Sequence, residues 1–314
     1  MSLSDPVAYA TEGVLDRLAE ISQLCSDAPD FWNVDPFERI EVRSWSVRGA
    51  LDCQAKEAAT PLTPFESTVG TVWRGAAVEA LEQLARTQTD PVAAYRAAYA
   101  AGHPRYWPWD WIRTDGKSRS GRANAAERAL VGANAIAFVS AAARAADQWP
   151  GAGYRHTGLR PQWFYPDRAL RLAGRIDVVN DTADGEVLSV FMPGGWSRHL
   201  RSLIAYEAVV ALLDGHRPNR MRVLFPDLGA HHTIEVRVDK ALIDEGLDVV
   251  GTAVTVCANQ RGMTQSPRPA TPGAQCHYCP IAATCDEGRT WLNGIGRRRF
   301  GFPLTSTPTK SDSA

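Results

Sequence analysis

The chain has 314 residues, of which 45% are hydrophobic and 22% are charged, and its formal net charge is −1. This composition is that of an ordinary globular protein, and six cysteines are too few for a disulfide scaffold. We find no charged-then-apolar signal segment and no apolar run near the roughly twenty residues that span a membrane. We therefore expect a soluble, cytoplasmic protein without a membrane partner, whose net charge neither indicates nor excludes nucleic-acid binding.

The first half of the chain is predicted to be helical, because apolar residues recur at helical spacing and alanine-rich stretches follow. The expected helices are residues 5–25, 44–51 with a Ser cap, 67–86, 92–101 and 123–147. Residues 103–122, between the helices expected at 92–101 and 123–147, form a basic connection rich in aromatic side chains.

The character of the sequence changes at Tyr154, after which strands are expected. The expected strands are residues 160–165, 170–179, 186–192, 221–225 and 233–238, with a turn over 180–185. The expected helices are 198–214 and one that Asp239 caps and that runs to about Cys257. An extended linker (266–275) leads into a cysteine-rich segment, and a Ser/Thr/Pro-rich tail follows. This order predicts an α/β fold with a central mixed sheet flanked by helices.

Four cysteines form the most specific pattern in the sequence. Cys276, Cys279 and Cys285 form a C-x₂-C-x₅-C array, and Cys53 lies far upstream after a short apolar segment. Thiolates are soft ligands that suit iron–sulfur clusters or zinc, and four of them complete a site. The alternative is that Cys276, Cys279 and Cys285 are three unrelated cysteines of a Cys/Pro-rich tail. Cys25 and Cys257 are interpreted as small buried hydrophobes, with Cys257 as a reserve ligand.

Several short motifs accompany the cysteines in a fixed order. They are Gly70 followed by Arg74, GRIDVV at 174–179 with Asp177, VLSVFMPGG at 187–195, and RSLIAY ending at Tyr206. Together with the cysteines, they resemble the RecB-type branch of the PD-(D/E)XK nuclease superfamily, in its iron–sulfur subgroup. That subgroup includes CRISPR spacer-acquisition nucleases and AddB-type recombination subunits. The resemblance covers roughly residues 44–290.

The resemblance implies a restriction-endonuclease-like central sheet and a [4Fe-4S] cluster held by Cys53, Cys276, Cys279 and Cys285. It also implies three parts of the chain: an N-terminal helical extension (1–43), a nuclease-like domain (44–300) with a helical insertion at about 87–150, and a disordered tail (301–314). The implied partners are DNA, including single-stranded DNA, or a protein of a DNA-processing, repair or defence complex.

The catalytic motifs depart from the family pattern. Asp177 matches the first metal-binding carboxylate, but Val190 and Met192 stand where the second carboxylate and the lysine belong. Arg74 replaces a histidine and Ser202 a glutamine, whereas Tyr206 is kept. Phosphodiester hydrolysis in this family needs Mg²⁺ or Mn²⁺ held by at least two oxygen ligands. We therefore predict a catalytically impaired protein that retains Asp177 as a remnant.

Two carboxylates are candidates to replace the missing ligand. Glu186 lies on the same strand as Val190, but four residues of extended chain place it about 13 Å away. Glu79 lies on the helix predicted at 67–86. If either serves, the chain is an active metal-dependent exonuclease whose catalytic residues have migrated. A third interpretation is a zinc-stapled protein-interaction module.

Basic and aromatic residues supply the candidate DNA contacts, which are Arg74, Arg105, Trp109 and Arg113. The last three belong to PRYWPWDWIR, where tryptophans alternate and arginines flank them, as in platforms that stack single-stranded nucleic acid. The alternative is a packed loop. Asp177 is also interpreted as an ion-pair partner of Arg175 or Arg74, and Tyr206 as core packing with a satisfied hydroxyl.

Overall fold

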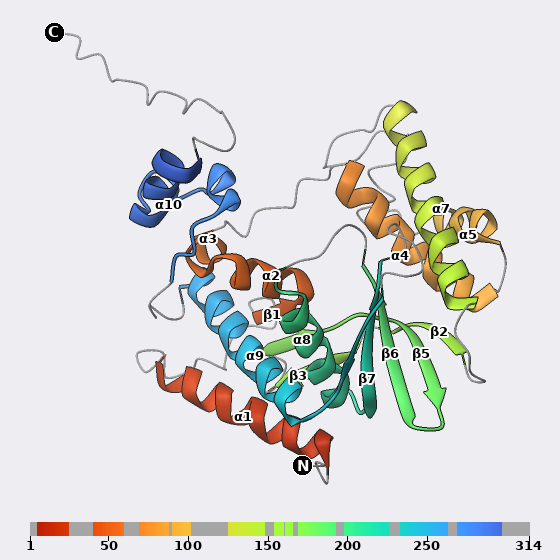
Figure 1. Ribbon diagram of the computed structural model, residues 1–314, viewed down its shortest axis with the longest axis horizontal. Coiled ribbons are helices and arrows are strands. Elements are labelled where there is room, and N and C mark those ends of the chain that lie inside the picture. Colours follow the sequence, from red (N-terminus) through yellow and green to blue (C-terminus); the bar gives the residue numbers. More distant parts are fainter. Residues whose placement is uncertain are drawn as a thin grey trace.

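The computed structural model describes residues 5–24, 40–59, 69–87, 90–101, 125–147, 154–159, 161–165, 169–192, 198–225, 233–262 and 269–296 (Figure 1). The helices are α1 (Pro6–Leu24), α2 (Ser44–Asp52), α3 (Gln54–Ala59), α4 (Val69–Thr87), α5 (Pro91–Ala101), α7 (Ala125–Asp147), α8 (Leu200–Leu213), α9 (Lys240–Gln260), η2 (Ala274–Tyr278), α10 (Asp286–Trp291) and η3 (Leu292–Gly296). The strands are β1 (Ile40–Arg43), β2 (Tyr154–Leu159), β3 (Gln162–Tyr165), β4 (Leu170–Ala173), β5 (Ile176–Thr182), β6 (Gly185–Phe191), β7 (Pro218–Leu224) and β8 (Thr233–Arg237).

The described strands form two sheets, both mixed. One has five strands in the order β2-β5-β6-β7-β8, in which β6 and β7 are parallel and the other pairs antiparallel. The other has three strands in the order β1-β4-β3, in which β1 and β4 are parallel. The parallel pair β6–β7 is connected through α8, as parallel neighbours require a crossover.

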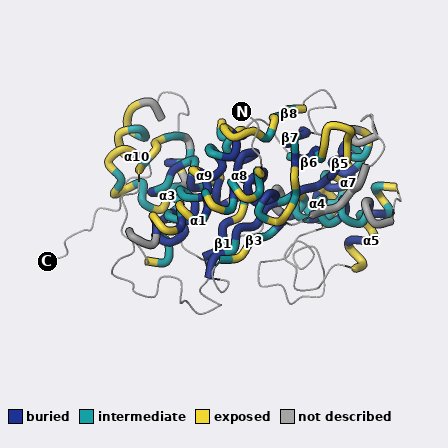
Figure 2. The backbone as a smooth tube through the Cα atoms, turned by 90° about the horizontal axis from the view of Figure 1, so that it is seen from below, coloured by how far each residue is buried: buried dark blue, intermediate teal, exposed yellow. Residues whose placement is uncertain are grey.

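Helix α8 packs against both sheets, which explains why it is apolar on all sides. One side, with Ile204, Ala205 and Ala208, contacts the face of the five-stranded sheet that carries Leu188 and Val190. The other side packs with α9 and α1 against the three-stranded sheet, through Leu203, Tyr206, Val209, Val210 and Leu212. Helices α4, α5 and α7 cover the opposite face of the five-stranded sheet, where Val178, Phe191 and Leu224 contact them (Figures 1 and 2). The prediction of a mixed sheet flanked by helices is confirmed.

The strand expected at 170–179 is in fact two strands, because the chain leaves one sheet and enters the other at Gly174. A Cβ at Gly174 would lie 2.5 Å from Oε2 of the buried Glu207 on α8, so glycine allows the close approach of helix and strand. Residues 170–173 therefore become β4 and residues 176–182 become β5.

Most other predicted elements are present. Asp239 caps α9 and accepts a hydrogen bond from Leu242 N at 3.0 Å, as predicted. Strands β1 and β2 and the short helices α3, η2, α10 and η3 were not predicted. The predicted Ser cap of α2 is wrong: Arg43 occupies the N-cap position without a side-chain hydrogen bond.

The three-part division of the chain stays a prediction. Within it, α1 and β1 share one hydrophobic cluster with α8 and α9. Helices α5 and α7, from the predicted insertion, share another with α4. The tail at 301–314 lies outside the described residues.

Candidate functional site

The four predicted cysteine ligands line one pocket, although Cys53 is far from the others in sequence. Cys53 directly follows α2, Cys276 lies in η2, Cys279 directly follows it, and Cys285 caps α10. The structure thus brings together the two ends of the predicted nuclease-like domain at this pocket.

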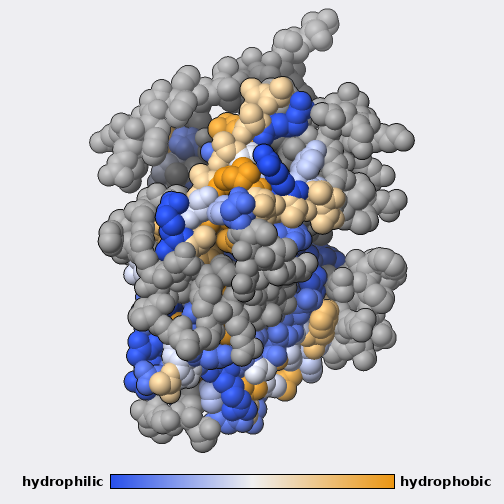
Figure 3. All heavy atoms as spheres, turned by 90° about the vertical axis from the view of Figure 1, so that its right-hand side faces the viewer, coloured by the Kyte–Doolittle hydropathy of each residue, from blue (hydrophilic) through white to orange (hydrophobic). Residues whose placement is uncertain are grey.

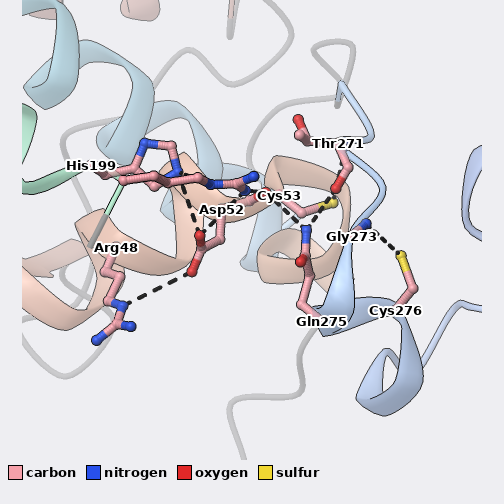
Figure 4. Close-up of polar contacts among 9 residues, drawn as sticks. Arg48, Asp52, Cys53, His199, Thr271, Gly273, Gln275 and Cys276 are labelled. Atoms are coloured by element: carbon pink, nitrogen blue, oxygen red, sulfur yellow. Dashed lines mark hydrogen bonds and ion pairs between the residues drawn. The ribbon is translucent and has the colours of Figure 1, made fainter. Parts of the chain in front are cut away.

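Backbone and amide contacts attach the C-terminal segment to the end of α2. Ala55 N donates to Pro269 O at 3.3 Å, and Gln275 Nε2 donates to Asp52 O at 3.2 Å and to Thr271 O at 2.7 Å (Figure 4). These contacts hold the turn at 271–275 against Cys53 from both sides. The proline-rich sequence of this segment favours the extended backbone that such docking requires.

Within the described segments, three of the four thiols accept a backbone N–H. Thr271 N lies 3.5 Å from Cys53 Sγ, Gly273 N lies 3.4 Å from Cys276 Sγ, and Gly288 N lies 3.4 Å from Cys285 Sγ. N–H donors favour the thiolate form of a cysteine, and hydrogen bonds to sulfur tune iron–sulfur clusters. The pocket therefore supplies donors that suit anionic sulfur.

The thiols differ in burial. Cys53 and Cys276 are each 6% exposed, whereas Cys279 and Cys285 are half-buried. Burial raises the pKa of the Cys276 thiol, against the Gly273 N–H, and the neighbouring thiols raise it further. Among the described residues, no group of three or more His, Cys, Asp or Glu side chains is arranged to bind a single metal ion. By type, thiols are the donors that iron–sulfur clusters and zinc sites use.

Cys257, the predicted reserve ligand, does not line this pocket. It lies in α9 within the hydrophobic core, where burial raises the pKa of its thiol to about 12. Its predicted role as a small buried hydrophobe is confirmed. Cys25 lies outside the described residues.

A charged cluster lies beside Cys53. The Asp52 carboxylate is 3.4 Å from both Arg198 Nη2 and His199 Nε2, and 4.0 Å from Arg48 Nε (Figure 4). Burial and the nearby Arg198 lower the pKa of His199, which favours its neutral form. Asp52, the residue before the predicted ligand Cys53, thus connects the end of α2 to the residues just before α8.

Asp177, which was predicted to be the remnant of a metal-binding motif, is buried and hydrogen-bonded within the chain. Oδ1 accepts from Arg175 Nε at 2.8 Å, and Oδ2 accepts from Phe191 N at 2.8 Å. The predicted pairing with Arg175 is confirmed. Asp177 therefore ties the start of β5 to the end of β6.

Next to Asp177 lies a buried carboxyl that the sequence analysis missed. Glu207 on α8 accepts a hydrogen bond from Ser44 Oγ and another, at 2.8 Å, from Arg175 N. Burial raises its pKa to about 7, and the charge of Asp177 adds to the rise. A single acidic residue inside the apolar run LIAYEAVVALL was the available signal, because a charge there must find partners.

The structure does not bring Glu186 to Asp177. Glu186 lies near the turn of the β5–β6 hairpin, paired with Asp181 across the strands. It accepts from Arg217 N at 3.0 Å, and His216 Nδ1 lies 3.0 Å away. It therefore serves to hold the loop after α8.

The remaining candidates occupy three different settings. Val190 is buried against α8, with Met192 partly buried beside it. Glu79 is half-buried on α4, and Arg74 is exposed on the same helix with its guanidinium 5.5 Å from the Trp73 ring. Arg105, Trp109 and Arg113 lie outside the described residues.

Tyr206 fulfils the predicted structural role. It is fully buried, and its hydroxyl donates to Val42 O at 2.9 Å and Ala173 O at 3.1 Å. It thus holds the ends of the parallel strands β1 and β4. Ser202, at the glutamine position of the motif, donates to Glu245 at 2.9 Å and so joins α8 to α9.

Comparison with protein-family models gives no match, and comparison with curated protein sequences gives none either. In the part of the chain that the structure describes, no helix has the length and apolar character needed to cross a membrane.

Proposed function

We propose that this chain is a nuclease-fold iron–sulfur protein without nuclease activity, which binds DNA or a protein of a DNA-processing complex. The observation that carries the proposal is the single pocket lined by Cys53, Cys276, Cys279 and Cys285. These four residues would hold a [4Fe-4S] cluster. The role of the cluster is mechanical, because it links the end of α2 to the C-terminal segment and its binding energy adds to folding.

The surroundings of Asp177 support the absence of catalysis. A metal ion that activates water needs carboxylates that can reach it, and Asp177 is buried and forms an ion pair with Arg175 as well as a hydrogen bond with Phe191 N. Val190 supplies no ligand, and Glu186 is held at the hairpin turn. The alternative of an active exonuclease with migrated carboxylates has Glu79 as its remaining candidate.

The test is a visible spectrum with iron and acid-labile sulfide analysis of protein purified without oxygen. We expect a brown protein, loss of the colour in Cys276→Ser, and full retention in Cys257→Ser, which removes a buried thiol outside the pocket. A colourless protein with one zinc and no sulfide would favour the zinc-stapled interaction module, and with it a role without nucleic acid.

Incubation with single- and double-stranded DNA and Mg²⁺ or Mn²⁺ tests the second half of the proposal. We expect binding that weakens with added salt and no cleavage. Cleavage that Glu79→Ala abolishes would instead establish the active exonuclease.

A further inference from the structure

Helix α10 faces the cysteine pocket with a glycine. Among the residues of this short helix, Gly288 alone is buried, and it lines the pocket. The residues on either side of it are charged or polar and exposed, namely Asp286, Glu287, Arg289 and Thr290. Glycine in a helix costs up to about 1 kcal/mol relative to alanine. The helix itself therefore does not favour glycine at this position.

The neighbours of Gly288 are two of the four thiols. A Cβ at this position would lie 3.4 Å from Cys285 Sγ and 3.7 Å from Cys276 Sγ. These are ordinary van der Waals distances, so an alanine would fit without displacing either thiol. Gly288 thus presents only its backbone to both sulfurs, and its N–H lies 3.4 Å from Cys285 Sγ. A methyl group there would touch both thiols.

This open space matters differently for the two metal groups that thiols bind. In a tetrahedral zinc site, with zinc–sulfur bonds of about 2.3 Å, the sulfurs close around one ion and lie about 3.8 Å apart. The described part of the chain has no group of three or more His, Cys, Asp or Glu side chains gathered around a single point in this way. In an iron–sulfur cluster each cysteine binds an iron of its own, so iron and sulfide fill the space among the thiols. A side chain in contact with two thiols takes part of that space.

We propose that Gly288 is a specificity-determining residue of the cysteine pocket. Because it has no side chain, it leaves open the space beside Cys276 and Cys285 that a multi-iron cluster needs and a single zinc ion does not. This role of Gly288 rests on the proposed function and adds the feature that selects between the two metal groups. Three other residues that line the pocket are likewise small, namely Ala55, Ala270 and Ala282.

A second helical glycine supplies the matched control. Gly132 lies in α7, and a Cβ there would be 3.4 Å from Tyr95 Oη and 3.7 Å from two carbons of the Tyr95 ring. The contacts of the added methyl group are therefore as close as those at Gly288. Figure 3 views the side of the molecule on which α5 and α7 lie in Figure 1, whereas α10 lies on the opposite side. Gly132→Ala thus adds the same group in the same kind of element, away from the thiols.

The experiment compares the full-length wild type, Gly288→Ala and Gly132→Ala, all purified without oxygen, by their content of iron, acid-labile sulfide and zinc. We expect wild type and Gly132→Ala to hold the same amounts of iron and sulfide. Gly288→Ala should lose most of its iron and sulfide and hold zinc in their place. Melting of the three proteins after chelation is the folding control. Metal-free Gly288→Ala should melt no lower than metal-free wild type, because alanine favours the helix and the methyl group meets both thiols at ordinary distances.

Three results would overturn the role of Gly288. The first is equal iron and sulfide in wild type and Gly288→Ala. The second is an equal loss in Gly132→Ala, which would make the effect general to an added helix methyl group. The third is a metal-free Gly288→Ala that melts below metal-free wild type, because the methyl group would then not fit where the geometry places it. Wild type without sulfide would overturn the proposed function and the role of Gly288 with it, whereas a cluster in wild type that Gly288→Ala retains concerns Gly288 alone.

Discussion

The cysteine pocket and the surroundings of Asp177 are both built from segments that the nuclease-like motifs single out, yet they differ in what their side chains are free to do. At the pocket, four thiols from both ends of the domain line one space, and three of them accept a backbone N–H. Asp177 lines no such space: it is buried, forms an ion pair with Arg175 and accepts a hydrogen bond from Phe191 N.

The difference shows that matching residue types is not enough to keep a site. A ligand must be able to reach a shared space, and the four thiols line one pocket. Asp177 has instead become part of a buried polar network with Arg175, Glu207 and Ser44. Such a network favours one arrangement of sheet and helices through the hydrogen bonds that its members make, although the buried Arg175 Nη2 has no hydrogen-bond partner.

The largest effect is expected from removing the metal group of the pocket. If the pocket holds the proposed cluster, chelation would open the link between Cys53 and the C-terminal segment, which by analogy with a long disulfide loop costs about 5 kcal/mol. The melting temperature should then fall by about 10 °C or more, measured by calorimetry without oxygen. Cys53→Ser should start at the lower value and not respond to chelator. An unchanged wild-type melting temperature after chelation would mean that no metal group links Cys53 to the C-terminal segment.

The next effect concerns the pH dependence contributed by Glu207. Its folded pKa of about 7 lies above the ordinary value of 4.5, so the folded chain holds the proton more tightly than the unfolded chain. The contribution of Glu207 to the free energy of unfolding is fully present below about pH 4.5 and is lost as the pH rises through about 7. Relative to Glu207→Gln, wild type should lose roughly 3 kcal/mol over this window, measured by urea unfolding. Arg175 and Asp177 face the carboxyl and stay in both proteins. If the free energies of unfolding of wild type and Glu207→Gln changed in parallel with pH, Glu207 would not titrate in this range.

Asp177→Asn should have a somewhat smaller effect on stability. The variant leaves Arg175 without its anion, and we expect a loss of about 2 kcal/mol with an unchanged urea dependence. Nucleic-acid affinity should stay within about twofold, because the carboxylate faces the chain rather than a ligand. If Asp177→Asn instead abolished a Mg²⁺-dependent cleavage at unchanged stability, Asp177 would be catalytic and the comparison would fail.

The smallest effect is expected for Arg74→Ala. Because Arg74 is exposed and stacks on Trp73 from outside, stability should change by less than about 0.5 kcal/mol. If Arg74 contacts a phosphate as predicted, the salt dependence of DNA binding should fall by about one contact. An unchanged salt dependence would remove Arg74 from the predicted DNA-binding residues.

The predictions that rested on local chemistry were confirmed. Asp239 before an apolar helix is a helix cap wherever the chain folds, because the first N–H groups need an acceptor. Tyr206 was predicted to pack in the core because a buried ring needs one partner for its hydroxyl, and Val42 O and Ala173 O supply it. The four cysteines line one pocket, whereas their role as metal ligands stays a prediction.

The predictions that depended on how distant segments meet were incomplete. The exchange of sheets at Gly174 is set by the approach of Glu207 on α8, which the strand pattern of 170–179 does not reveal. Ser44 looked like a helix cap, but its hydroxyl donates to Glu207 instead. β1 is four residues long, and its partner β4 lies far along the chain, so no local pattern indicates it.

Native mass spectrometry of protein purified without oxygen tests the central claim most directly. We expect a mass that exceeds that of the bare chain by about four irons and four sulfides. Cys257→Ser should show the same increase, and Cys276→Ser should show none. A wild-type mass equal to the bare chain, or to the chain with one zinc, would contradict it.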